Sequence, residues 1–221
     1  MKSSKPSLVL IVLALIAGTA YGQSSRMGFS LQPELNMVLQ NPNSFIVENI
    51  APKFGFSALV MVESNMNENW SLRSGLGFNQ SRFGINTPFI FEDDIDPTLG
   101  APLSKDYTFR SLFIPIGFVF SKPESFIGLV VGADMNLHFN RKIEKLYPSV
   151  TARKVVESKS TTVLNPSLNV GIQFKFSVGD SPANLLIEPY SKFYFLSQEI
   201  RDSNMLSMGF RFVYMTDIYG D

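Results

Sequence analysis

Apolar and polar residues alternate with a period of two along most of this chain. The clearest stretch runs from Trp70 to Asn79, where Leu72, Leu76 and Phe78 share one face. Successive side chains of a β-strand point to opposite faces, so this pattern predicts strands rather than helices. Eight segments show it: 29–36, 54–62, 70–79, 111–120, 127–139, 164–176, 185–195 and 206–214. Most approach the ~9–11 residues of a tilted membrane strand, and an even number suits a closed antiparallel barrel.

Alternation alone does not separate a soluble β-sandwich from an outer-membrane barrel. The apolar face is the core of a sandwich, whereas it meets lipid in a barrel. The links favour the barrel, because outer-membrane barrels have short periplasmic turns and longer outer loops. Long links at 37–52, 82–106 and 140–162 alternate with short ones at 64–69, 121–125 and 178–184. The final outer link, 197–203, departs from this rhythm by being short.

Glycines and aromatic residues favour the barrel as well. Glycine is costly in a strand interior, yet a narrow barrel has little room inside and its strands must bend. The polar faces carry Gly75, Gly77, Gly117, Gly128, Gly132, Gly171 and Gly209. Aromatic rings near strand ends are typical of girdles at the membrane interface. We assign to such girdles Phe29, Phe54, Trp70, Tyr107, Phe109, Phe139, Phe195 and Tyr214.

The N-terminal residues predict a secretory signal peptide. Lys2 and Lys5 precede an apolar run of ten residues over 8–17, and the small residues Ala20 and Gly22 follow it. This order of a positive segment, a short apolar segment and small residues is that of a cleavable leader. An uncleaved anchor is the weaker alternative, because a membrane-spanning helix needs ~20 apolar residues.

The composition changes the picture in two ways. Charged residues make up 17% of the chain, below the ~25% of soluble domains, and 20 Phe and 7 Tyr are present. This balance favours a chain with a lipid-facing surface. The formal net charge of +0 excludes a whole-chain attraction to nucleic acid. The chain has no cysteine, no phosphate-cradling glycine loop and no metal-ligand motif, so we expect no cofactor and no metal.

One hairpin carries a likeness to a known family. A strand with an Ile-Pro pair runs from Phe109 to Phe120, a turn covers 121–125, and a glycine-rich strand runs from Phe126 to Asp134. This hairpin resembles the central hairpin of PorT-like outer-membrane β-barrel proteins. The resemblance implies a small Gram-negative outer-membrane barrel, and some members of that family are linked to a secretion system. The segment 215–221 after Tyr214 departs from the usual aromatic ending of such barrels.

Seven charged residues on the polar faces are expected to point into the lumen. Buried charges must be paired, and an eight-stranded barrel has little open bore. We therefore predict a structural ion-pair network, with a gated conduit or a ligand pocket as the functional alternative. Its members are Glu34, Arg73, Asp134, Lys175, Glu188, Lys192 and Arg211.

His138 is the single histidine, and it is the one candidate for lipid chemistry. A hydrolase or acyltransferase would need a nucleophile and an orienting group beside it, and its strand offers no serine at a neighbouring position of that face. We therefore expect no catalytic residue. The acidic link 92–96 lacks the glycine and distal glutamate of a calcium-binding loop. The basic link 140–162 carries groups that suit lipopolysaccharide phosphates or closure over the acidic link.

The predicted function is that of an integral outer-membrane β-barrel in a non-enzymatic structural, assembly or secretion-accessory role. We expect a signal peptide over 1–22 and one barrel domain over 23–221. The expected partners are outer-membrane lipid, lipopolysaccharide and other envelope or secretion-system proteins, and no nucleic acid. The alternatives are an outer-membrane lipid-modifying enzyme and a lipocalin-like soluble barrel that binds a small apolar ligand.

Overall fold

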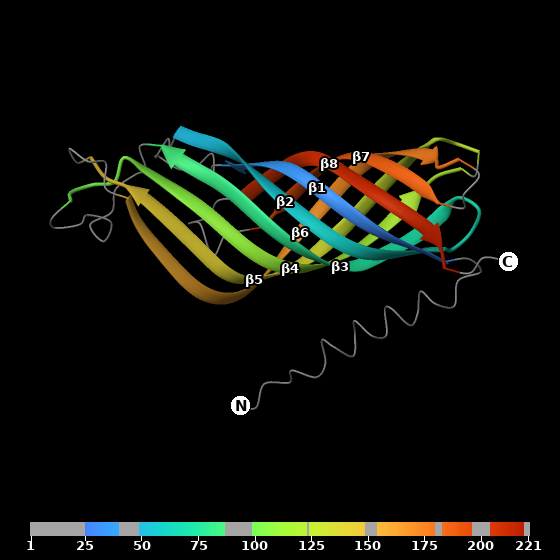
Figure 1. The fold of residues 1–221 in the computed structure, drawn as a ribbon, viewed down its shortest axis with the longest axis horizontal. Helices are drawn as coiled ribbons and strands as arrows, with labels where there is room; N and C mark the ends of the chain where they lie inside the picture. The colour runs from blue at the N-terminus through green and yellow to red at the C-terminus, as the bar shows by residue number, and fades with distance from the viewer. Residues whose placement is uncertain are drawn as a thin grey trace, which may run out of the picture.

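The chain folds into a closed antiparallel β-barrel (Figure 1). The computed structural model describes residues 25–39, 49–86, 99–122, 124–148, 154–179, 183–195 and 204–218. Its strands are β1 (Ser25–Leu39), β2 (Asn49–Asn65), β3 (Trp70–Asn86), β4 (Ser104–Phe120), β5 (Ile127–Leu146), β6 (Lys154–Ser177), β7 (Asn184–Tyr194) and β8 (Asn204–Asp217). Each strand pairs with the next, and β8 pairs with β1. This confirms the predicted fold class, whereas the predicted signal peptide lies outside the described residues.

The outer wall of the barrel is apolar. Every strand exposes large apolar side chains, from Phe29 on β1, which is 48% exposed, to Phe212 on β8, which is 44% exposed. A soluble protein rarely exposes so continuous an apolar surface, whereas the hydrocarbon of a bilayer requires one. The described part of the chain contains no helix that is long and apolar enough to cross a membrane. The exposure of these side chains shows that the apolar faces of the strands point outward.

The two ends of the barrel differ. The connections 66–69, 121–126 and 178–183 are short, and they lie at the same end as Ser25 and Asp217 (Figure 1, right-hand side). Short turns of outer-membrane barrels face the periplasm. We therefore name this end the periplasmic end and the opposite one the outer end.

The first periplasmic turn is held by an asparagine. The side-chain oxygen of Asn67 accepts hydrogen bonds from the backbone N–H groups of Asn69 and Trp70, both at 2.9 Å. The Trp70 carbonyl in turn accepts from the Met66 N–H at 2.8 Å. Asparagine favours turns because its side chain replaces a backbone partner in this way. The turn therefore fixes where β2 ends and β3 begins.

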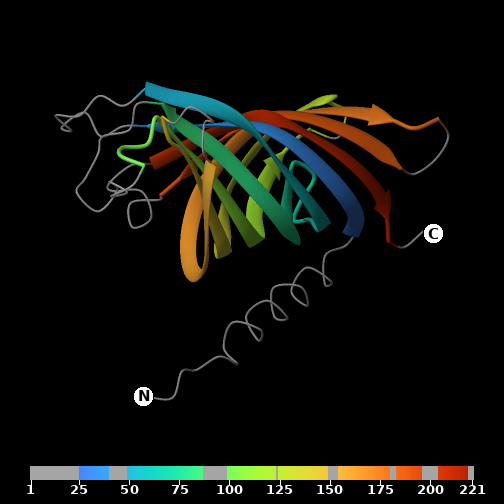
Figure 2. The same ribbon diagram turned by 60° about the vertical axis from the view of Figure 1, so that its left-hand side comes forward.

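The strands at the outer end are longer than the alternation predicted. The link expected over 140–162 is mostly sheet, because β5 continues to Leu146 and β6 begins at Lys154. Likewise β3 extends to Asn86 and β4 begins at Ser104, inside a second expected link. The polar composition of these segments resembles that of loops, but a hydrogen-bonded hairpin that projects into water tolerates polar side chains on both faces. The first half of β6 curves strongly (Figure 2).

A β-bulge in β5 reverses which residues face inward. The consecutive β4 residues Arg110 and Ser111 pair with Asn140 and His138, which leaves Phe139 as an extra residue. One extra residue shifts the alternation of a strand by one position. Between Ile127 and the bulge the buried residues of β5 are even-numbered, whereas after the bulge the buried residue is the odd-numbered Lys145. The bulge therefore ends the period-two pattern of β5.

The lumen contains apolar side chains as well as polar ones. The cluster nearer the outer end consists of Val38, Phe83, Ile85, Phe109, Tyr194 and Met205. The cluster nearer the periplasmic end consists of Leu59, Met61, Phe113, Leu186, Val213 and Met215. The assignment of Phe109 and Tyr107 to an aromatic girdle at the membrane interface was therefore wrong, because Phe109 is 0% exposed and Tyr107 packs against the first cluster. Both share the inward parity of Phe113 on β4.

We predict that Gly209→Ala destabilises the barrel. Gly209 pairs with Glu34 of β1, and an added Cβ would lie 2.2 Å from the Pro33 carbonyl oxygen, a backbone atom. We expect the free energy of unfolding, measured by urea titration of the protein in phospholipid vesicles, to fall by about 1–3 kcal/mol. Gly117→Ala is the matched control, because its Cβ would meet no atom closer than 3.3 Å. Equal losses in the two variants would contradict the prediction.

Candidate functional site

Five charged side chains form a continuous series of ion pairs in the periplasmic half of the lumen. Arg73 lies at its centre, with its Nη2 2.7 Å from Glu63 Oε2 and its Nη1 2.6 Å from Glu188 Oε1. Arg211 extends the series, with its Nη1 2.9 Å from Glu188 Oε2, and Arg26 contacts the other carboxylate oxygen of Glu63. We call these five residues the charge chain.

Strand register explains part of the charge chain, and barrel closure explains the rest. Glu63 and Arg73 are direct partners on β2 and β3, as are Glu188 and Arg211 on β7 and β8. The contact between Arg73 and Glu188 crosses the lumen, because β3 and β7 are not neighbours. Apart from Arg26, each side chain is 8% exposed or less. Each buried charge thus has an opposite charge beside it, which burial requires.

A second buried ion pair ties β5 to β7. Lys192 Nζ lies 2.7 Å from Asp134 Oδ2, and both side chains are 1% exposed or less. Asn169, on the intervening β6, donates a hydrogen bond to the other oxygen of Asp134 at 2.9 Å. The Lys192 ammonium also lies 4.9 Å from the centre of the Phe113 ring, whose face attracts a cation. These contacts hold three consecutive strands together inside the lumen.

Glu34 is held by neutral donors. Its carboxylate accepts hydrogen bonds from the Tyr190 hydroxyl at 2.9 Å, from Asn79 Nδ2 at 3.0 Å and from the Ser81 hydroxyl at 3.3 Å. No salt bridge to Glu34 occurs among the described residues. Several good donors can compensate a buried carboxylate in place of a cation. Glu34 therefore joins β1, β3 and β7 through hydrogen bonds.

The seven residues predicted to face the lumen divide into two groups. Six of them are buried among these contacts: Glu34, Arg73, Asp134, Glu188, Lys192 and Arg211. Lys175 is half-buried at the periplasmic mouth, and no ion pair joins it to an acid in the part of the chain that the structure describes. Glu63 was not among the predicted residues, because it lies between the strand predicted over 54–62 and the link predicted over 64–69. Every second residue of β2 faces the lumen, and Glu63 is the next such residue after Leu59 and Met61.

His138 faces the lumen and not the lipid. Its side chain is 1% exposed, and its ring packs edge-on against Phe109 at a centroid distance of 5.6 Å. Within the described ranges, neither ring nitrogen has a hydrogen-bond partner. A general base needs a proton donor within reach and a group that orients it. The acidic link 92–96 and the basic residue Arg153 lie outside the described residues.

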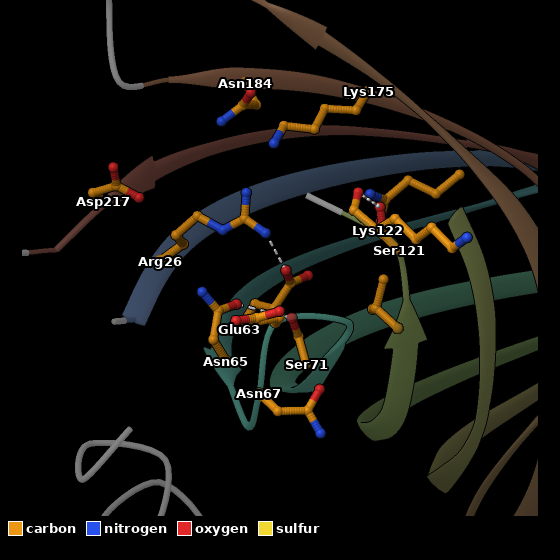
Figure 3. Close-up of a pocket in the computed structure, with 13 residues that line it drawn as sticks. Arg26, Glu63, Asn65, Asn67, Ser71, Ser121, Lys122, Lys175, Asn184 and Asp217 are labelled. Carbon is orange, nitrogen blue, oxygen red and sulfur yellow. Dashed lines mark hydrogen bonds and ion pairs between the residues drawn. The ribbon is translucent and has the colours of Figure 1, made fainter. Parts of the chain in front are cut away.

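A polar cavity of about 410 Å³ opens at the periplasmic mouth (Figure 3). Its walls include Arg26, Glu63, Lys122, Gln173, Lys175 and Asp217. We call this cavity the periplasmic vestibule. Its floor is the charge chain, since Arg73 Nη2 donates to Gln173 Oε1 at 2.9 Å. A cavity farther along the lumen, beside Arg73 and Leu59, holds about 20 Å³, which is room for about one water molecule.

We predict that Arg73→Ala strongly destabilises the barrel. The substitution leaves Glu63 and Glu188 buried with one partner fewer, and such losses cost about 3–5 kcal/mol. Urea titration of the protein in detergent measures this loss. Arg110→Ala is the matched control, because Arg110 is exposed and donates to Gln80 at 3.2 Å on the outer wall. We expect the control to stay within about 0.5 kcal/mol of the unsubstituted protein. An unchanged unfolding midpoint for Arg73→Ala would contradict the prediction.

Solved structures of other barrels resemble this chain, among them the three that follow. The attachment invasion locus protein Ail of Yersinia pestis, in complex with the heparin analogue sucrose octasulfate, is 16% identical over 87% of this chain and 99% of its own, with a TM-score of 0.44. Neisserial surface protein A is 9% identical over 85% of this chain and 95% of its own, with a TM-score of 0.48. The N-terminal β-barrel domain of Pseudomonas aeruginosa OprF is 9% identical over 83% of this chain and 96% of its own, with a TM-score of 0.33.

No curated protein sequence matches this chain. A family model does, since that of the outer membrane protein beta-barrel domain matches residues 14–195, more than half of the chain. The match agrees with the closed eight-stranded sheet and its apolar outer wall. The chain is therefore an integral outer-membrane protein and belongs to the outer membrane protein beta-barrel domain family.

Proposed function

We propose that this protein is a non-conducting, non-enzymatic barrel with a structural, assembly or secretion-accessory role of the PorT-like kind. The observation that carries the proposal is the contact between Arg73 and Glu188, which places the charge chain across the lumen. An eight-stranded barrel has an interior that side chains can fill. A solute would have to separate buried ion pairs in order to pass, and that separation is costly.

The rest of the lumen supports the same proposal. The two apolar clusters lie on the inner wall together with the Lys192–Asp134 pair, and the cavity beside Arg73 holds about 20 Å³. His138 sits inside this filled lumen without a partner for its ring nitrogens among the described residues, which favours a role other than lipid hydrolysis. The protein would then act through its two rims.

The outer rim offers the larger surface for contacts. The hairpin of β5 and β6 carries basic side chains that include Lys142 and Lys159, and Lys145 pairs with Glu157 at 2.8 Å. The Glu157 side chain is 52% exposed, and an ion pair that is open to water is weak and screened by salt, so the hairpin leaves a polar surface available to partners. We propose outer-membrane lipid, lipopolysaccharide phosphates and other envelope proteins as these partners.

Ion conductance tests the closed lumen. We expect the purified protein in planar bilayers to give no steady current steps. The double variant Arg73→Ala, Glu188→Ala removes the cross-lumen contact, and we expect it to leak ions. Heat-modifiable gel mobility of the variant shows whether it is folded, and Arg110→Ala is the control that stays closed. Regular current steps from the unsubstituted protein would refute the proposal.

Site-specific crosslinking tests the rims. The chain has no cysteine, so a single introduced cysteine carries a photo-crosslinker to one position. In native outer membranes, we expect Ser158→Cys on the outer hairpin or Asn67→Cys in a periplasmic turn to give discrete protein adducts. Leu168→Cys is the control, because Leu168 is 55% exposed on the lipid-facing wall. Adducts at Leu168 with none at either rim would count against a role in assembly or secretion.

A further inference from the structure

We propose that the periplasmic vestibule binds a short peptide that carries both a free amine and a free carboxylate. The vestibule has a volume of about 410 Å³, within the range of about 300–1,000 Å³ that is common for ligand pockets. Three cations and three carboxylates line it. These charges are divided between its walls, and that division selects the ligand.

One wall of the vestibule has an excess of negative charge. Arg26 contacts Glu63, which Arg73 also binds, and Asp217 is the register partner of Arg26 on β8. Glu68, in the turn between β2 and β3, lines the same cavity and adds a third carboxylate. Figure 3 shows Arg26 and Asp217 together on one side of the cavity. A ligand amine would be attracted to this wall.

The opposite wall has an excess of positive charge. Lys122 follows β4 and Lys175 lies near the end of β6, and both side chains line the cavity. No ion pair joins either lysine to an acid among the described residues. Figure 3 shows Lys122 across the cavity from Asp217, with Lys175 reaching in from a third side. A ligand carboxylate would be attracted here.

The floor of the vestibule is fixed before any ligand arrives. Glu63 is 1% exposed and Gln173 is 2% exposed, and Arg73 donates hydrogen bonds to both. Groups that are already held in place lose little freedom on binding, which favours affinity. A purely anionic ligand such as a phosphate would gain from the two lysines but would be repelled by Asp217 and Glu68, which no ion pair joins to a cation among the described residues. The geometry thus favours a bipolar ligand over either single charge.

Trialanine in four forms tests the proposal. The peptide is offered with both ends free, with only the amine free, with only the carboxylate free, and with both ends blocked. Binding to the full barrel in nanodiscs is followed by NMR shift changes of the vestibule residues. We expect the form with both ends free to bind at least several-fold more tightly than either half-blocked form, and the fully blocked form not to bind. Equal binding of the four forms, or equal binding of the carboxylate-only form and the doubly free form, would overturn the proposal.

Charge-neutralising variants separate the two walls. We expect Lys175→Gln to weaken the forms with a free carboxylate several-fold while leaving the amine-only form unchanged, and Asp217→Asn to do the reverse. Lys159→Gln on the outer hairpin and Glu157→Gln beside it are the matched controls, because they change the same charges at the opposite end of the barrel. An equal loss of peptide affinity in a control and in its matched vestibule variant would overturn the proposal. The inference goes beyond the proposed function, since the vestibule lies at the periplasmic mouth whether or not the barrel conducts ions. Current steps in the conductance test would therefore refute the closed lumen without refuting peptide binding.

Discussion

The pairing of β8 with β1 is the constraint on which the rest of this structure depends. It runs from Arg26 opposite Asp217 to Leu39 opposite Asn204, and it leaves the sheet without an edge. Hydrocarbon offers no hydrogen bonds, so a sheet in a bilayer must pair all its backbone groups internally. Closure then assigns the two faces of each strand, because one face must meet lipid and the other must fill a narrow lumen. Gly209 illustrates how tight the closure is, since β1 leaves no room there for a Cβ.

A narrow lumen also determines how the charges inside it are arranged. Side chains from opposite walls meet, so Arg73 of β3 reaches Glu188 of β7 without an intervening water layer. Neither charge could remain in the lumen alone, because burial without a partner costs several kcal/mol. The apolar clusters around these pairs exclude water and strengthen the attraction between the charges. The interior of the barrel is thus packed like a protein core, which supports the proposed closed state.

Because the interior is packed, the polar surfaces that are open to ligands and partners lie at the two ends of the barrel. At the outer end, β5 and β6 continue as a polar hairpin. At the periplasmic end, the charge chain reaches the vestibule, whose floor includes Glu63 and Gln173. The same buried residues therefore cross the lumen and form the floor of the cavity. This links the proposed closed state of the barrel to the division of charge around its periplasmic mouth.

The sequence by itself determined the local features of this protein. Period-two alternation identified eight strands and their lipid-facing sides, and it assigned all seven predicted charges to inward faces. The direction of a side chain in a strand depends on its neighbours in the chain. Tertiary structure alone decided which charges meet. Arg73 and Glu188 are 115 residues apart, and no local pattern relates them. The bulge at Phe139 and the inward position of Phe109 also escaped the pattern, since a register shift and a packed interior depend on the strands opposite. Lys175 lies on an inward face, but only the shape of the mouth decided that it lines a cavity and not the charge chain.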